Sequence, residues 1–238
     1  TGQAYATDKA LLKDYSNITD TLFVHADTLR LYTYNMDTDS VYRVLHGYFH
    51  VRAYRSDVQA VCDSLVYNTG IRRMAMYRDP IVWNNKQQLL GEEIYTFLND
   101  STIDSVRVEN QALLVEQFDS IHYNQVTSQI MKSYFEKGEI RENQAEGNVY
   151  VIYYPLDEDS VIVGLNYTET SQLRMFMENR KLKRIWTPEA TGTFYDVSII
   201  PNDKLRLENF AWFDYIRPRD KFDLFEWRPK KAGTELKK

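Results

Sequence analysis

The sequence predicts an all-β protein built from repeating antiparallel strand units. Aromatic residues, which suit the pleated and half-buried surface of a sheet, are abundant, with 18 Tyr, 11 Phe and 4 Trp among 238 residues. Apolar residues recur at every second position over short runs, which is the period of a strand buried on one face. Only nine Gly and six Pro interrupt the chain, and the prolines fall at the ends of these runs, where a missing amide donor does little harm.

The alternation is clearest in four runs, each of which predicts a strand with one apolar face. These runs are residues 49–53, 58–62, 74–76 and 173–177. Turn-forming residues separate such runs, for example at Asn68-Thr69-Gly70 and Lys137-Gly138. One stretch, residues 10–15, favours a short helix instead.

A first repeated pattern is an apolar alternation that changes phase at an aspartate. Apolar positions are mostly even-numbered before Asp27, Asp63 and Asp119 and odd-numbered after them. A slip of one residue would turn the side chains of a flat strand to the wrong face. The pattern therefore predicts a bend or bulge at each aspartate that keeps one face inward, with the carboxylate bonding local backbone amides.

A second repeated pattern is a turn followed by an apolar strand, at residues 46–51, 109–114 and 146–151. The second position is Gly or Asn in each copy, and both residues tolerate positive φ. The two patterns predict units of roughly 27 to 37 residues in a stacked β-architecture. We expect one continuous β domain over residues 1–238, with repeat units at about 22–115 and 116–227 and a basic tail at 228–238.

Charge and composition exclude several function classes. The net charge of −5 disfavours nucleic acid as a partner, because phosphate binding needs a positive footprint. From Arg217 onward, eight Lys and Arg face four Asp and Glu, which is typical of a solvated basic terminus, although an anionic partner stays open. Cys62 is the single cysteine, so a disulfide framework is excluded, and its alternation with Val58 and Ala60 predicts a small core residue rather than a nucleophile.

Candidate catalytic and metal-binding residues are few. The sequence contains no nucleophile elbow, Walker loop, dinucleotide fingerprint or His-Glu-x-x-His motif, so we expect a non-enzymatic protein without a cofactor. His46 and His50 would lie about 13 Å apart on a strand, too far to share a metal ion. The acidic run at residues 157–159 favours a solvated turn over a calcium site, and the repeated aspartates favour structural corners over catalysis.

Short motifs in the chain resemble the OstA/LptA family. They are the strand start Gly147-Asn148-Val149-Tyr150-Val151, the corners Ala26-Asp27 and Cys62-Asp63, the segment Leu90-Gly91-Glu92-Glu93-Ile94 and the segment Asp79-Pro80-Ile81-Val82-Trp83. The family comprises organic-solvent-tolerance and lipopolysaccharide-transport proteins of the Gram-negative envelope, and the likeness is strongest to the OstA-like proteins of Bacteroidetes. It covers roughly residues 22–163 and continues more weakly to residue 227.

The resemblance implies an open, V-shaped β-jelly-roll in the periplasm or at the outer membrane. Its apolar interior would shield the acyl chains of lipopolysaccharide or lipid A, and its open sheet edges would join other OstA-like proteins, or further copies head to tail, by strand addition. The side chains expected to line the apolar groove are Val24, Ala26, Leu29, Phe49, Val51, Ala60, Cys62, Leu65, Leu114, Phe118, Ile121, Val149 and Val151.

Two other functions stay open at this point. A cell-surface carbohydrate-binding β-module would place several Trp and Tyr side chains next to one another on an exposed face. A structural envelope scaffold without a ligand would have a closed and fully packed interior.

Overall fold

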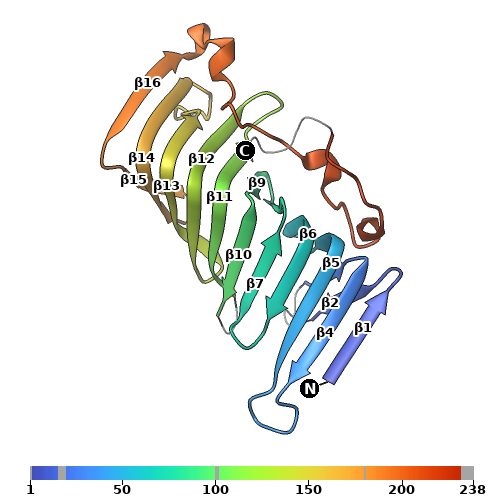
Figure 1. Cartoon of the computed structure of the whole chain (residues 1–238). Coiled ribbons are helices and arrows are strands. Elements are labelled where there is room, and N and C mark those ends of the chain that lie inside the picture. Colours follow the sequence, from blue (N-terminus) through green and yellow to red (C-terminus); the bar gives the residue numbers. More distant parts are fainter. Residues whose placement is uncertain (1, 16–19, 100–101, 180, 232–238) are drawn as a thin grey trace.

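The predicted all-β class is confirmed by the computed structural model of the chain, which describes residues 2–15, 20–99, 102–179 and 181–231 (Figure 1). Within these residues, sixteen strands form a single antiparallel sheet. The helices of the described part are 3-10 turns of three residues each, so none of them has the length to span a bilayer.

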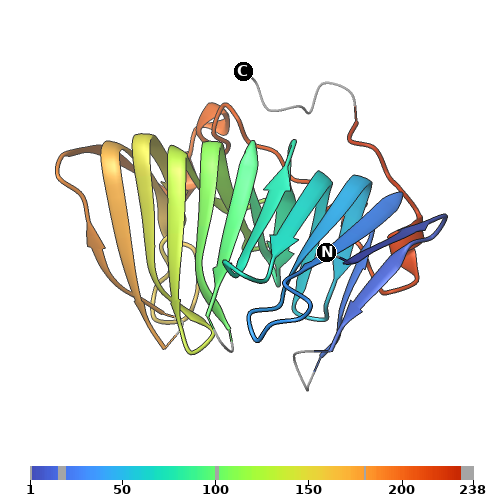
Figure 2. The same ribbon diagram turned by 60° about the horizontal axis from the view of Figure 1, so that its bottom comes forward.

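Six long strands bend in the middle and divide the sheet into two walls (Figures 1 and 2). They are β5 (Tyr42–Tyr54), β6 (Val58–Asn68), β11 (Ile103–Gln117), β12 (Tyr123–Glu136), β13 (Glu139–Tyr153) and β14 (Gly164–Glu178). The two halves of a long strand pair with different neighbours. In β6, for example, residues 64–68 pair with β7 (Arg73–Tyr77), whereas residues 58–61 pair with β8 (Ile81–Asn84).

The short strands belong to one wall each. The first wall contains β7 together with β1 (Gly2–Thr7), β4 (Thr28–Tyr34), β10 (Glu93–Leu98) and β15 (Lys181–Trp186). The second wall contains β8 together with β2 (Leu11–Asp14), β3 (Leu22–His25), β9 (Gln87–Leu90) and β16 (Ala190–Asp196). The helix predicted over residues 10–15 is therefore wrong, because pairing with β3 draws this segment into the sheet as β2.

The line where the two walls meet, here called the crease, is formed by pairs of residues with left-handed backbone. Such pairs occur at Asp8-Lys9, Phe49-His50, Arg78-Asp79, Asn110-Gln111 and Gly147-Asn148. In β5, β11 and β13, two of these residues lie opposite a single residue of a neighbouring strand, which is the geometry of a bulge. The pairs recur at every second passage of the chain across the crease, so the structural unit is two bent strands.

The second sequence pattern thus marks the crease and not a turn between strands. Positive φ at Asn110, Gly147 and Asn148 agrees with the residue types, but the chain continues through these positions without reversing. In the copy at residues 46–51, Phe49 and His50 have the positive φ. Gly47 serves close packing instead, since a Cβ there would lie 3.3 Å from Cγ2 of Val51 and 3.5 Å from Cβ of Ala26.

Acidic residues lie at the crease on the strands between these pairs. Asp27 Oδ2 is 2.8 Å from His50 Nδ1, and Asp63 Oδ2 accepts a hydrogen bond of 3.3 Å from Arg78 Nη1. Both aspartates therefore occupy the predicted corner. Their inward-facing neighbours change phase as expected, from Val24 and Ala26 to Leu29 and from Ala60 and Cys62 to Leu65.

The predicted bend within a strand is wrong for Asp119, which lies in the hairpin between β11 and β12, whereas the predicted bonding of its carboxylate to local backbone amides is confirmed. There its Oδ1 accepts the backbone N–H groups of Ile121 and His122, both at 2.8 Å, as an aspartate does in a tight turn. A hairpin interrupts the alternation just as a crease does, so the two patterns look alike in sequence. The third acidic corner is Glu92, whose Oε2 accepts a bond of 3.2 Å from Asn110 Nδ2.

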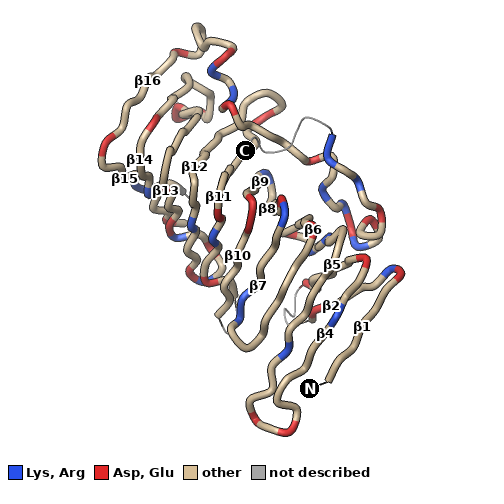
Figure 3. The backbone as a smooth tube through the Cα atoms, in the orientation of Figure 1, with Lys and Arg blue, Asp and Glu red and all other residues tan. Residues whose placement is uncertain are grey.

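Residues 197–231, here called the strap, leave β16 and return across the outer face of the second wall (Figures 1 and 2). The strap contains four 3-10 turns: η1 (Val197–Ile199), η2 (Asn202–Lys204), η3 (Asp214–Ile216) and η4 (Asp223–Phe225). Its apolar side chains join those of the wall in one core cluster through Phe213 and Ile216 and in another through Leu207. The strap carries charges of both signs, and the expected basic tail at 228–238 is described only as far as residue 231 (Figure 3).

Candidate lipid-binding interior

The inner face of the first wall carries an uninterrupted row of apolar residues and glycine beside the crease. Each member is the direct cross-strand neighbour of the next, and all are buried. The row runs Leu29, Gly47, Leu65, Met76, Ile94, Val108, Met131, Ala145 and Leu173. Because the row follows the crease across many strands, the bottom of the V is apolar along most of its length.

The inner face of the second wall carries a matching row. It runs Leu12, Val24, Ala53, Ala60, Val82, Leu89, Leu114, Val126 and Val151 before it reaches the polar Thr168. Most of these side chains are only partly buried, and they belong to the same core cluster as the row of the first wall. Side chains of the two walls therefore pack in one interior, and its exposed part lies away from the crease.

A further row of the first wall changes character along the sheet. Leu31, Leu45, Tyr67 and Met74 form its apolar beginning, and Thr96, Val106, Ser133 and Asn143 follow as direct neighbours. Burial raises the pKa of Tyr67, and the carboxylate of Asp14, on the opposite wall, raises it further. Of the two ends of this row, the amino-terminal one is the more apolar.

Ten of the thirteen predicted groove residues belong to this interior cluster. Seven of them are buried, namely Val24, Ala26, Leu29, Val51, Cys62, Leu65 and Val149, and three are partly buried, namely Ala60, Leu114 and Val151. The buried members are between 0% and 6% exposed, so an alkyl chain would touch the partly buried rows and not the bottom of the crease.

Three predicted groove residues lie elsewhere. Phe49 is 54% exposed at the crease, because its left-handed backbone breaks the alternation of β5. Phe118 and Ile121 lie in the hairpin after β11, where Ile121 is 61% exposed. None of the three is a member of the interior cluster.

Several interior residues escaped the sequence analysis, among them Val82 and Leu89. Their strands, β8 and β9, are buried on both faces, because the strap covers the outer one. Apolar residues on both faces hide the alternation, and Ile81-Val82-Trp83 and Leu89-Leu90 read as continuous runs. Such runs are the available signal for a strand covered on both sides.

The chemistry available in the interior is that of apolar contact. Cys62 is a buried core residue, as predicted, and burial strongly raises the pKa of its thiol, which donates to the carbonyl oxygen of Ser64 at 3.3 Å. The thiol therefore stays protonated and is a poor nucleophile. Among the described residues, no three His, Cys, Asp or Glu side chains gather in a geometry that could hold a metal ion.

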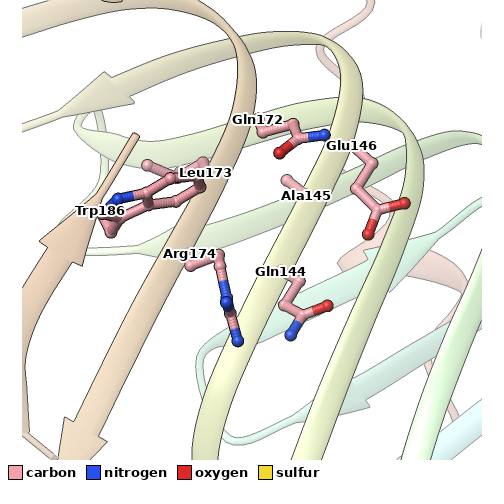
Figure 4. Close-up of a pocket in the computed structure, with 7 residues that line it drawn as sticks. All are labelled: Gln144, Ala145, Glu146, Gln172, Leu173, Arg174 and Trp186. Atoms are coloured by element: carbon pink, nitrogen blue, oxygen red, sulfur yellow. The ribbon is translucent and has the colours of Figure 1, made fainter. Parts of the chain in front are cut away.

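A small polar hollow of about 210 Å³ lies near the carboxy-terminal end of the first wall (Figure 4). It is lined by residues 144–146 of β13, residues 172–174 of β14 and Trp186 of β15. Gln144 and Arg174 are direct neighbours across the two strands. The volume is below the range of roughly 300–1,000 Å³ that is usual for ligand pockets, so the apolar interior remains the stronger candidate.

The fold defines a creased antiparallel sheet with an apolar interior between its walls and a strap on its outer side. Comparison with known proteins adds no identity to this description. The chain matches no protein-family model, and it matches no curated protein.

Proposed function

We propose that the protein binds lipid without catalysing a reaction and shields acyl chains between the two walls of its sheet. The observation that carries this proposal is the continuous row of partly buried apolar side chains from Leu12 to Val151 on the second wall, which shares one cluster with the first wall. Transfer of a methylene group from water contributes about 0.8 kcal/mol, so a chain of about twelve carbons would gain on the order of 10 kcal/mol in such a cleft.

The lipid class follows from the resemblance to the OstA/LptA family. We place the protein in the periplasm of a Gram-negative bacterium, where it would bind the acyl chains of lipopolysaccharide and assist their transport to the outer membrane. The sheet ends fit an assembly of several such proteins. Among the described residues, β1 pairs only with β4, and β15 pairs only with β14. Either edge offers free backbone groups to a strand of another copy or of a related protein.

The test is photo-crosslinking with a photoreactive amino acid at Leu114, which faces the interior and is partly buried. We expect a covalent adduct when the protein is mixed with purified lipopolysaccharide. The matched control carries the same probe at Ile121, which is 61% exposed in the hairpin after β11, and should give no adduct.

Equal adducts at both positions, or none at Leu114, would contradict the proposal. The second outcome would favour the ligand-free scaffold, a reading to which the packed bottom of the crease lends some support. A third probe, at Val149, tests whether the yield of adduct falls with the burial of the labelled position. This residue is 1% exposed, so we expect it to react much less than Leu114.

A further inference from the structure

The outer face of the first wall carries a contiguous row of rings on β4 and β5, here called the aromatic strip. It consists of Tyr32, Tyr34, Tyr42, His46 and Tyr48, all partly buried. Tyr34 and Tyr42 are stacked, with centroids 4.9 Å apart and planes at 12°, and His46 and Tyr48 are stacked at 5.7 Å and 10°. Tyr32 contacts both pairs, at 6.5 Å from Tyr34 and 5.6 Å from His46.

An open hollow of about 770 Å³ begins where the strip ends, at Tyr48. Across the outer face it is lined by Tyr48, Ser64, Tyr77 and Glu93, which are successive cross-strand neighbours. The crease contributes Phe49, Asp63, Arg78, Asp79 and Glu92. The volume lies within the usual range for ligand pockets.

The strip and the hollow are separate from the lipid-binding interior. Side chains of β5 alternate, so His46 and Tyr48 point outward, whereas Leu45 and Gly47 face the interior. The strap contacts the second wall and the crease. At the rim of the hollow, the Lys230 ammonium group of the strap lies 3.7 Å from the Asp79 carboxylate.

The geometry points to a binding site for an oligosaccharide without negative charge, either neutral or carrying amino groups. A sugar ring offers an apolar C–H face that packs on an aromatic ring, and hydroxyl groups that bond to phenol and carboxylate oxygens at its edge. The aromatic strip supplies the rings in a row, as successive sugar units require. The hollow adds the carboxylates of Asp63, Glu92 and Glu93 beside Tyr48.

Charge excludes the anionic alternatives. Four carboxylates line the hollow against the guanidinium of Arg78 and the Lys230 ammonium group at the rim, so the balance of charge is negative and would repel phosphorylated or uronic-acid-containing ligands. Burial lowers the pKa of His46, and the nearby Arg30 lowers it further, so the imidazole in the strip is neutral at pH 7. Two valines, Val44 and Val66, flank the rings as direct neighbours of Tyr32 and His46, so this face is mainly aromatic, whereas the lipid-binding interior is mainly aliphatic.

The experiment is affinity electrophoresis of the whole chain in gels that contain a soluble β-glucan, chitosan or polygalacturonate. We expect retardation by the neutral or the amine-bearing polysaccharide and none by polygalacturonate. Tyr34→Ala and Tyr48→Ala should each weaken binding by up to about tenfold, and Tyr48→Phe, which keeps the ring, should lose much less. Tyr150→Ala, at a tyrosine 37% exposed on the second-wall half of β13, is the matched control and should bind like the parent chain.

Retardation by polygalacturonate alone, or by none of the three polymers, would overturn the inference. So would full binding in the double variant Tyr34→Ala/Tyr48→Ala. Circular dichroism of each variant separates lost binding from lost folding, and Tyr48→Phe keeps the test decisive if Tyr48→Ala unfolds. The lipid crosslink at Leu114 is scored separately, so a failure of either proposal leaves the other measurable.

Discussion

The outer faces of the two walls differ, although both belong to one sheet. On the second wall, Val61, Ile81, Leu90 and Leu113 form a row of direct neighbours that is buried beneath the strap. The outer face of the first wall carries Lys132, Gln144 and Arg174 on β12, β13 and β14, and ion pairs such as Lys132–Glu146 at 3.0 Å face solvent there. The comparison shows why the second wall is apolar on both faces. The strap covers its outer face as an additional layer, whereas the alternation of a strand alone would leave that face polar.

Three buried glutamines, Gln59, Gln88 and Gln125, hold the strap on the second wall, and Gln59 Oε1 accepts a hydrogen bond of 2.7 Å from Arg217 Nε. Gln88 Nε2 donates to the carbonyl oxygen of Ala211 at 2.9 Å, while its Oε1 accepts the backbone N–H of Phe213 at 2.7 Å. Gln125 pairs in the same way with the Leu205 carbonyl and the Leu207 N–H, at 3.0 Å and 2.8 Å. A chain that crosses strands cannot join their backbone ladder. The side-chain amide, which donates and accepts like a peptide group, takes the place of a strand neighbour.

The largest effect should come from Trp83→Ala. Trp83 is fully buried between the second wall and the strap, and its Nε1 donates to Gln88 Oε1 at 3.1 Å. We expect the free energy of unfolding to fall by about 3–5 kcal/mol in urea denaturation, because a large cavity would form. Tyr95→Ala, on the outer face of the first wall, is the control and should lower it by about 1 kcal/mol. Equal losses would contradict the contrast between the two faces.

A smaller effect is expected from Gln88→Leu. The substitution leaves the Phe213 N–H and the Ala211 carbonyl buried without their partner, at a cost of about 1–3 kcal/mol. Limited proteolysis should then cut within the strap before the sheet. The control is Gln144→Leu on the first wall, whose amide donates to Glu142 at 2.9 Å and whose loss should change stability by about 0.5 kcal/mol or less. Unchanged proteolysis in Gln88→Leu would show that apolar packing alone holds the strap.

The smallest and most local effect should be the release of the end of the strap at acidic pH. Burial tends to raise the pKa of Asp223, but hydrogen bonds from Arg228 and from the backbone N–H of Arg219, together with the charge of Arg52, lower it overall. Since the folded pKa lies below the unfolded value of about 3.9, this stabilisation is complete above that pH and is lost as the pH falls through the folded pKa.

We therefore expect the end of the strap to detach in acid below about pH 4. Trp227, whose ring lies 4.5 Å from that of His50, should report the release as a change in its fluorescence. Asp223→Asn should lack this acid step. An identical acid profile in the variant would show that protonation of Asp223 does not release the strap.

The inner face was predictable because its period is simple. Val24, Ala26, Cys62 and Leu65 take the expected sides, and the phase change at Asp63 correctly indicates a crease. Asp119 was misleading, because a hairpin also interrupts the alternation. Glu92 was missed because Leu90, two residues earlier, is apolar on the outer face and conceals the change of phase.

The strap was not predictable from periodicity. Its 3-10 turns impose no long repeat, and apolar residues such as Phe213 and Ile216 dock on a wall far away in the sequence. The aromatic strip left a clearer trace, since Tyr32 and Tyr34 alternate with the inward-facing Leu31. Tyr32 and Tyr34 lie beside His46 and Tyr48 because of the register between β4 and β5, and the sequence does not specify this register.

The left-handed pairs at the crease have a consequence for how such a molecule can change length. Every second passage carries the extra residue that tucks the chain around the bend, and the passages between carry none. Loss or gain of a single passage would place two passages of the same kind next to each other. The apolar face of the added or remaining strands would then point outward. A hairpin that contains one passage of each kind can be added or removed as a unit. The sheet therefore lengthens and shortens by two passages at a time.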